Sequence, residues 1–177
     1  PSSRSAPAGV TVPTTRPRVI VVASIFPGTP HADASRRFAS AVAATKGRVY
    51  FSVVLRVEFA QALRKLVTRR QLPDAFREQY QLGEWERNVL VRQRWYTEGA
   101  RRLDAFFAQF AESFEIPPRP PLWQRSFEFM ALYGLAALDA VQVATADQIA
   151  VHHFATGDEH FRRVDVVTVH LVHDAHS

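Results

Sequence analysis

Apolar and polar positions along the chain fall into blocks that predict short buried strands with helices between them. The run "RVIVVASIF" at residues 18–26 is continuous, apolar and rich in β-branched side chains, and "PGTP" ends it. Such a run is typical of a strand buried in a parallel sheet. Further strands are predicted at residues 47–52 ("GRVYFS"), at the start of 114–121 ("FEIPPRPP"), at 151–158 ("VHHFATGD") and at 166–172 ("VVTVHLV").

Between these strands the apolar positions recur three and four residues apart, which predicts helices. This spacing is found at residues 31–44, 53–70 and about 84–113. The segment "LWQRSFEFMALY" is expected to form a helix ending at Gly134, because glycine readily takes the left-handed conformation found after helices. Strands that alternate with helices predict an α/β fold with a mainly parallel sheet.

The segment "AALDAVQVATADQIA" predicts one more helix. If Ala136 is its N-cap, Asp139 takes the third helical position, where the helix dipole favours a carboxylate. The small side chains of this segment would let the helix pack closely on the sheet.

The length and composition favour one domain that contains no disulfide. The chain has 177 residues and no cysteine, so disulfides and thiolate zinc sites are excluded. Residues 1–17 are rich in Pro, Ser and Thr, and we expect a disordered tail or an expression remnant there, with a single domain over residues 18–177. The apolar stretches are too short for a membrane span and no signal peptide opens the chain, so we expect a cytoplasmic protein.

The basic residues are concentrated in the first part of the chain. Residues 1–73 hold 12 Lys or Arg but only two acids, whereas residues 74–115 hold six basic and eight acidic residues. Arginine, which binds phosphate bidentately, accounts for all but two of the 22 basic residues. This bias suits nucleic-acid binding, although a GC-rich genome would produce it as well.

Three carboxylates lie in segments that otherwise resemble core. Glu58 borders a helical apolar stripe, Asp139 is in a first helical turn, and Asp158 ends a predicted strand. Each alone has an ordinary explanation, as a solvated flank, a dipole partner or a cap. In an open parallel sheet, however, ligands bind beyond the carboxyl ends of the strands. Three acids that met there would need a divalent cation, and oxygen ligands favour Mg²⁺ or Mn²⁺.

Two adjacent motifs in the last third of the chain resemble a known family. "ALDAVQVATA" followed by "ATGDEHF" is similar to the C-terminal motifs of PIN-domain nucleases, and more narrowly to VapC-type toxins of bacterial toxin–antitoxin pairs. The family's helix start is matched by Asp139–Ala140, and its Thr-x-Asp-x-x-Phe motif by Thr156, Asp158 and Phe161. The family's early helical Glu is matched by Glu58, and the resemblance covers about residues 18–173.

The resemblance implies a PIN-like three-layer sandwich and a metal-dependent endoribonuclease. It assigns Glu58, Asp139 and Asp158 as catalytic residues and as ligands of Mg²⁺ or Mn²⁺, with Ser24 and Thr156 in support. Arg36 and Arg37 are expected to bind RNA. The implied partners are an RNA substrate, a cognate antitoxin protein and a second copy of the chain, with no membrane.

The chain departs from the family at the first strand, which normally ends in Asp. On the predicted strand at residues 18–26, Val22 takes that position, and no acid precedes Asp33. The alternatives are therefore an impaired PIN-like module that binds RNA or protein without cleaving, and an α/β domain outside the family whose acids are ordinary caps.

A helical arm is predicted at about residues 74–115. It is amphipathic and slightly acidic, so we expect it to contact protein rather than RNA. Trp85, Trp95 and Tyr96 are candidate anchors, with packing as the alternative. The histidines at 170, 173 and 176 are three residues apart, a spacing that on a strand does not converge on one metal.

Overall fold

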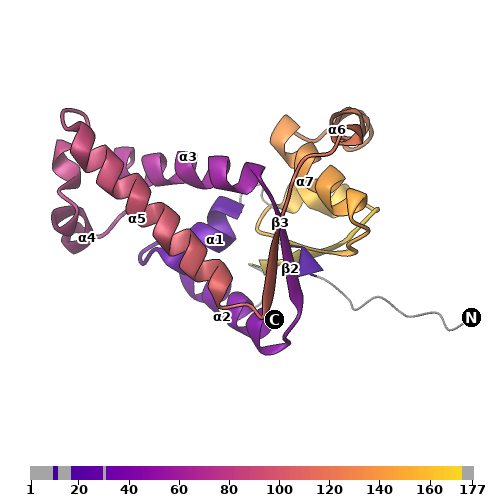
Figure 1. The fold of residues 1–177 in the computed structure, drawn as a ribbon, viewed down its shortest axis with the longest axis horizontal. Helices are drawn as coiled ribbons and strands as arrows, with labels where there is room; N and C mark the ends of the chain where they lie inside the picture. The colour runs from indigo at the N-terminus through magenta and orange to yellow at the C-terminus, as the bar shows by residue number, and fades with distance from the viewer. Residues whose placement is uncertain (1–9, 12–16, 30, 173–177) are drawn as a thin grey trace, which may run out of the picture.

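Five parallel strands form one sheet at the centre of the molecule (Figure 1). The computed structural model describes residues 10–11, 17–29 and 31–172. The strands lie in the order β3-β2-β1-β4-β5, and every neighbouring pair is parallel. Their bounds are β1 Val10–Thr11, β2 Arg48–Ser52, β3 Glu112–Ile116, β4 His153–Thr156 and β5 Thr168–Leu171. The prediction of a mainly parallel sheet is confirmed.

The direction of chain progression reverses beside β1. From β1 the chain moves outward to β2 and then β3, and it later returns to β4 on the other side of β1. Thr11 pairs with Tyr50 on one side and with Phe154 on the other. The carboxyl ends of β1 and β4 therefore lie together at a topological switch point, the usual ligand-binding place in open α/β sheets.

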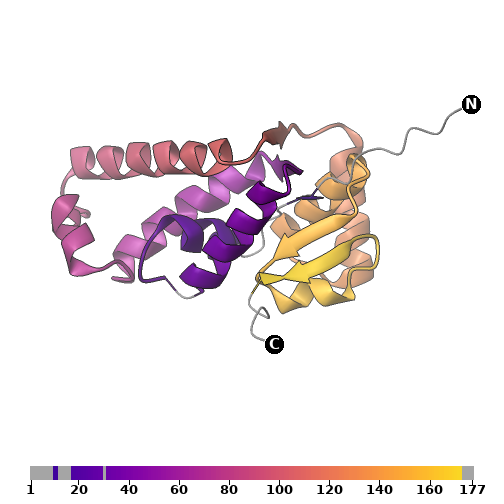
Figure 2. The same cartoon turned by 90° about the horizontal axis from the view of Figure 1, so that it is seen from below.

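Helices cover both faces of the sheet and produce three layers (Figures 1 and 2). One hydrophobic cluster includes Val49 and Phe51 of β2 with residues of α1, α2, α3 and α5, and a second includes Phe154 of β4 with residues of α6 and α7. The helix bounds are α1 Pro17–Ile25, α2 Ala32–Ala44, α3 Val54–Thr68, α4 Asp74–Gln79, η1 Leu82–Glu84, α5 Val89–Ala108, α6 Pro121–Tyr133, α7 Ala137–Gln148 and η2 Glu159–Arg163.

The second cluster accounts for part of the apolar character of α6 and α7. In the described part of the chain no single helix is long and apolar enough to cross a membrane. These two helices pass that test only as a pair, by length and composition, and they are bent by 115°. The bend lies at Gly134, whose positive φ of 60° ends α6 as predicted.

The predicted first strand at residues 18–26 is wrong, because most of this segment forms α1. Ile20, Val21, Val22 and Ala23 are all at most 4% exposed, so the helix is buried on every side and shows no amphipathic period. A short apolar run without that period cannot be assigned to strand or helix by pattern. Pro17 occupies the first position of α1, and proline there is a sequence signal for the start of a helix.

The expected tail at residues 1–17 is also wrong in its extent. Val10 and Thr11 form β1, which lies between β2 and β4 in the middle of the sheet. A two-residue strand among Pro, Ser and Thr residues has too short a pattern to be recognised from sequence. Residues 1–9 and 12–16 lie outside the described residues.

A helical arm extends from the sheet (Figure 2), and several of its aromatic side chains pack into the first hydrophobic cluster. It comprises α4, η1 and α5, whereas the expected arm at 74–115 included residues that belong to β3. Trp95 is fully buried and its indole N–H donates to the Leu63 carbonyl at 3.2 Å, and Trp85 is 6% exposed. Both tryptophans are therefore core residues rather than partner anchors, whereas Tyr96 is only partly buried against the same cluster.

Close contact between α3 and α5 depends on Gly99. A Cβ added at this position would lie 2.1 Å from the Leu63 Cδ1 atom, so any larger residue would have to displace the Leu63 side chain. The Leu63 side chain of α3 therefore packs directly against the α5 backbone at Gly99.

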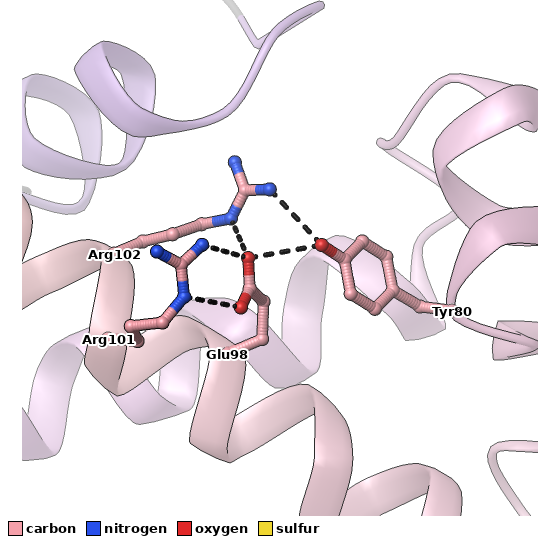
Figure 3. Close-up of polar contacts among 4 residues, drawn as sticks. All are labelled: Tyr80, Glu98, Arg101 and Arg102. Carbon is pink, nitrogen blue, oxygen red and sulfur yellow. Dashed lines mark hydrogen bonds and ion pairs between the residues drawn. The ribbon is translucent and has the colours of Figure 1, made fainter.

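A charged network holds α4 against α5 (Figure 3). The Glu98 carboxylate accepts from Arg101 in two bonds of 2.8 Å, from the Arg102 Nε atom at 2.7 Å and from the Tyr80 hydroxyl at 3.1 Å. The Arg102 guanidinium also lies 4.9 Å from the ring centre of Phe76. The hydrogen bond from Arg101, reinforced by those from Arg102 and Tyr80, lowers the pKa of Glu98 to about 2 against the opposing effect of burial.

We expect Glu98→Gln to lower the free energy of unfolding by about 1–2 kcal/mol at pH 7. Because the folded-state pKa is depressed, the stabilisation is present above the unfolded pKa near 4.5 and is lost as the pH falls toward 2. Urea unfolding of both proteins across this range should show the difference vanish in acid. The exposed Glu78→Gln variant in α4 is the control, and an equal loss there would contradict the prediction.

Candidate active site at the carboxyl edge of the sheet

Asp158 lies just beyond the carboxyl end of β4, as predicted. Its backbone N–H donates to the buried Thr156 hydroxyl at 3.1 Å, which fixes the turn after the strand. Its Oδ1 atom accepts from the backbone N–H of His160 at 2.9 Å and also lies 2.7 Å from the His160 Nδ1 atom. Asp158 is thus the N-cap of η2 and only 9% exposed, at the switch point of the sheet.

Asp139 lies in the first turn of α7. Ala136 is the N-cap of this helix, so the prediction that Asp139 takes the third helical position is confirmed. Ala136 provides no side-chain cap, and the helix dipole favours a carboxylate in this turn. Asp139 precedes Gln142 by one helical turn, so both side chains project from the same face of α7.

Glu58 lies on α3 and faces α7. The carboxylate is 6% exposed and its Oε2 atom accepts from the Gln142 amide at 3.1 Å. Gln142 itself is 1% exposed. Glu58 is therefore not a solvated flank, which was the ordinary alternative to its predicted role, because α7 covers it.

The structure joins Glu58 on α3 to α7, the helix that carries Asp139, and places Asp158 just after β4. Glu58 and Asp158 are almost fully buried, and burial of a carboxylate is costly unless its charge is compensated. An all-oxygen set of this kind suits Mg²⁺ or Mn²⁺ in ligand type. Among the residues that the structure describes, however, no three His, Cys, Asp or Glu side chains are grouped as metal ligands.

Ser24 and Val22 do not occupy the positions expected for them. Ser24 lies in α1 and its hydroxyl donates to the Ile20 carbonyl at 2.6 Å, one turn back along the same helix. Val22 is 4% exposed and belongs to the hydrophobic cluster around α1 and α3. The position after the first strand instead falls in residues 12–16, "VPTTR", which contain no acid and lie outside the described residues.

The two arginines expected to bind RNA are on the surface of α2. Both are exposed, and the Arg36 guanidinium lies 2.5 Å from the Asp33 carboxylate. Within the described part of the chain Arg37 makes no such ion pair. Arg37 is therefore the better placed of the two to meet phosphate.

Two residues at this edge were not predicted from sequence. Gln142 links α3 to α7, and His160 contacts the Asp158 carboxylate. Gln142 could have been noticed as the one amide in the apolar run "DAVQVATA", three residues after Asp139. His160 carries no comparable signal, because a histidine two residues beyond an acid is common on surfaces.

Comparisons with known proteins agree on the fold. The family model described as PIN domain matches residues 20–167. A chain in the crystal structure of VapBC2 from Rickettsia felis, bound to a DNA fragment from their promoter, superimposes with a TM-score of 0.55 and 13% sequence identity. That likeness covers 92% of this chain and 98% of the other, and at this identity it shows the fold alone. No curated protein matches the chain.

We expect Val22→Asp to destabilise the protein by about 3 kcal/mol or more, because it buries an unpaired carboxylate in a hydrophobic cluster. It should not create a metal ligand. Val89→Asp is the matched control, since Val89 is 53% exposed at the start of α5. Thermal unfolding of the three proteins, and Mg²⁺ titration of any that fold, would show this. A Val22→Asp protein of normal stability with tighter Mg²⁺ binding would refute this placement of Val22.

A double-mutant cycle should measure the contact between α3 and α7. Gln142→Leu leaves the buried Glu58 oxygen without its amide donor, and we expect a loss of about 1–3 kcal/mol in the free energy of unfolding. Once Glu58→Leu is present, the further cost of Gln142→Leu should be smaller by about 1 kcal/mol or more. Thr145→Val, whose hydroxyl donates to the Val141 carbonyl within α7, should show no such coupling to Glu58.

Proposed function

Because the chain belongs to the PIN-domain family, we propose that it is a metal-dependent endoribonuclease of the VapC toxin type. The observation that carries this proposal is the burial of Glu58 and Asp158 at the carboxyl edge, with Asp139 one turn from the partner of Glu58. These are the residues that match the family's motifs. RNA is proposed as the substrate on the basis of that resemblance and of the arginine-rich first part of the chain.

The chain's own residues would prepare the site for a hydrated cation. Glu58, Asp139 and Asp158 would hold Mg²⁺ or Mn²⁺ directly or through water, and Mg²⁺ commonly keeps several waters while using one or two carboxylates. When bound, such an ion lowers the pKa of a water molecule and offsets charge on the scissile phosphate. The turn bond from Asp158 to Thr156 and the amide of Gln142 would fix the carboxylates in place.

Proton transfer and substrate positioning would also rely on named side chains. One of the three acids would accept the proton of the attacking water. Arg37, which is exposed on α2, would draw the phosphate backbone toward the edge of the sheet. His160 beside Asp158 would hold that carboxylate in one orientation through the bond to its Oδ1 atom.

A specific observation favours a second candidate, a PIN-like module that binds RNA without cleaving it. No acid occurs in residues 12–16 after β1, and the described residues form no three-ligand metal group. Fewer carboxylates bind Mg²⁺ more weakly. Measurement of binding and cleavage side by side separates the two candidates.

An antitoxin protein and a second copy of the chain are the proposed partners. The VapBC2 structure that shares the fold is a complex bound to DNA, which supports an antitoxin as one partner. The apolar anchors for either partner would not be Trp85 or Trp95, which are buried. Large exposed apolar side chains instead include Val89 and Leu90 on the arm and Trp123 and Phe127 on α6.

We expect the purified chain to cleave single-stranded RNA when Mg²⁺ or Mn²⁺ is added and to stop when EDTA removes it. Asp158→Asn and Asp139→Asn should each lower the cleavage rate by about 100-fold or more. Asp74→Asn, at the exposed start of α4, is the matched control and should cleave normally. If the chain binds RNA but does not cleave it at any metal concentration, the nuclease proposal is rejected and the RNA-binding module is favoured.

A further inference from the structure

Two imidazoles face each other on neighbouring strands, away from the proposed active site. His153 begins β4 and His170 lies in β5, and the His153 Nδ1 atom is 3.1 Å from the His170 Nε2 atom. The ring centres are 5.3 Å apart. His153 precedes Thr156 by three strand residues, which is about 10 Å along β4. His170 pairs with Ala155 and lies one residue before the end of β5, so His153 is the member of the pair farther from the carboxyl edge.

The strand register explains why these two side chains meet. His153 pairs with Thr168 and Ala155 pairs with His170, so the histidines are diagonal neighbours on one face of the sheet. Diagonal positions on paired strands are within reach of long side chains. The pair is held by paired backbone rather than by loops, and β5 is the edge strand, so solvent can reach it.

We propose that His153 and His170 form a binding site for a borderline transition-metal ion such as Zn²⁺, Ni²⁺ or Cu²⁺. Two nitrogens that each lie about 2.0–2.1 Å from one metal are about 2.8–3.4 Å apart at bond angles between square and tetrahedral. The observed 3.1 Å falls within that range, and it is also the length of a hydrogen bond between the two rings, which a bound metal would replace. Rotation of the two rings would turn both lone pairs toward one common point, and water would fill the other coordination positions.

Electrostatics favours the form of the pair that binds metal. Two protonated imidazoles at this distance would repel each other, so at least one ring is neutral in the folded protein. Burial, and then the neighbouring His153, lower the pKa of His170. Neutral imidazole is the ligand form for these metals, whereas Mg²⁺ prefers oxygen. The pair therefore differs in metal preference from the three carboxylates of the proposed active site.

A metal bound here would join the edge strand β5 to β4. Binding to the folded state alone raises stability in proportion to the logarithm of metal concentration. The bound metal would thus stabilise the last strand of the sheet, independently of catalysis. The C-terminal residues that follow carry His173 and His176, which lie outside the described residues and serve as controls in the test.

The proposal is tested by calorimetric titration of the full chain with ZnCl₂ in excess Mg²⁺. Thermal unfolding is then measured with and without Zn²⁺. We expect one Zn²⁺ per chain and a rise in the melting temperature. Loss of an outer-shell partner already costs about 10–100-fold in metal affinity, so His153→Ala and His170→Ala should each weaken binding by about tenfold or more. Histidine ring resonances in NMR spectra should identify these two side chains as the ones that respond.

Three control variants test whether Zn²⁺ binding is specific to His153 and His170. His152→Ala, the exposed neighbour of His153, and the double variant His173→Ala with His176→Ala should keep the binding. Asp158→Asn should also keep it, which separates this site from the proposed active site. Circular dichroism would confirm that each variant is folded. The proposal is overturned if Zn²⁺ does not bind stoichiometrically, or if binding survives both His153→Ala and His170→Ala.

Discussion

The hydrogen bond from Gln142 to Glu58 joins the two halves of the molecule. Glu58 belongs to α3, which packs in the cluster formed with α1, α2 and α5, and Gln142 belongs to α7, which packs with α6 on the other side. A buried carboxylate is tolerated only with a donor or a compensating charge close by. The contact of α3 with α7 is therefore constrained, and it sets where the first turn of α7 places Asp139.

At the carboxyl edge, Asp158 has a structural role and also lies where a ligand would bind. Asp158 caps η2 and fixes the turn after β4, which is an ordinary structural role for Asp after a strand. It is also almost fully buried at the switch point, where ligands of open α/β sheets bind. A capping role and a ligand role are compatible, because a carboxylate offers two oxygens with about four acceptor sites.

The arm and the body are stabilised by different interactions. The packing of Leu63 on Gly99 and the hydrogen bond from Trp95 hold α5 to α3, whereas Glu98 with Arg101, Arg102 and Tyr80 ties α4 to α5. The two tryptophan side chains of the arm are buried by this packing and cannot form a partner surface. The apolar side chains left exposed on the arm include Val89 and Leu90, whereas Trp123 and Phe127 are exposed on α6.

The sequence by itself determined the helices whose apolar positions recur with a clear helical period. It also determined the local role of residues whose neighbours form a recognisable motif. The helices around Glu58 and Asp139, the cap at Ala136, the end of α6 at Gly134 and the turn at Asp158 all follow from local pattern. Only the tertiary structure decided that residues 17–25 are helical, because full burial removes the amphipathic period that separates helix from strand. It likewise decided that Val10 and Thr11 form the central strand, because pairing with β2 and β4 is a long-range interaction that two residues cannot encode. The meeting of Gln142 with Glu58 and of His153 with His170 was undetermined for the same reason, since helix packing and strand register bring together residues far apart in the chain.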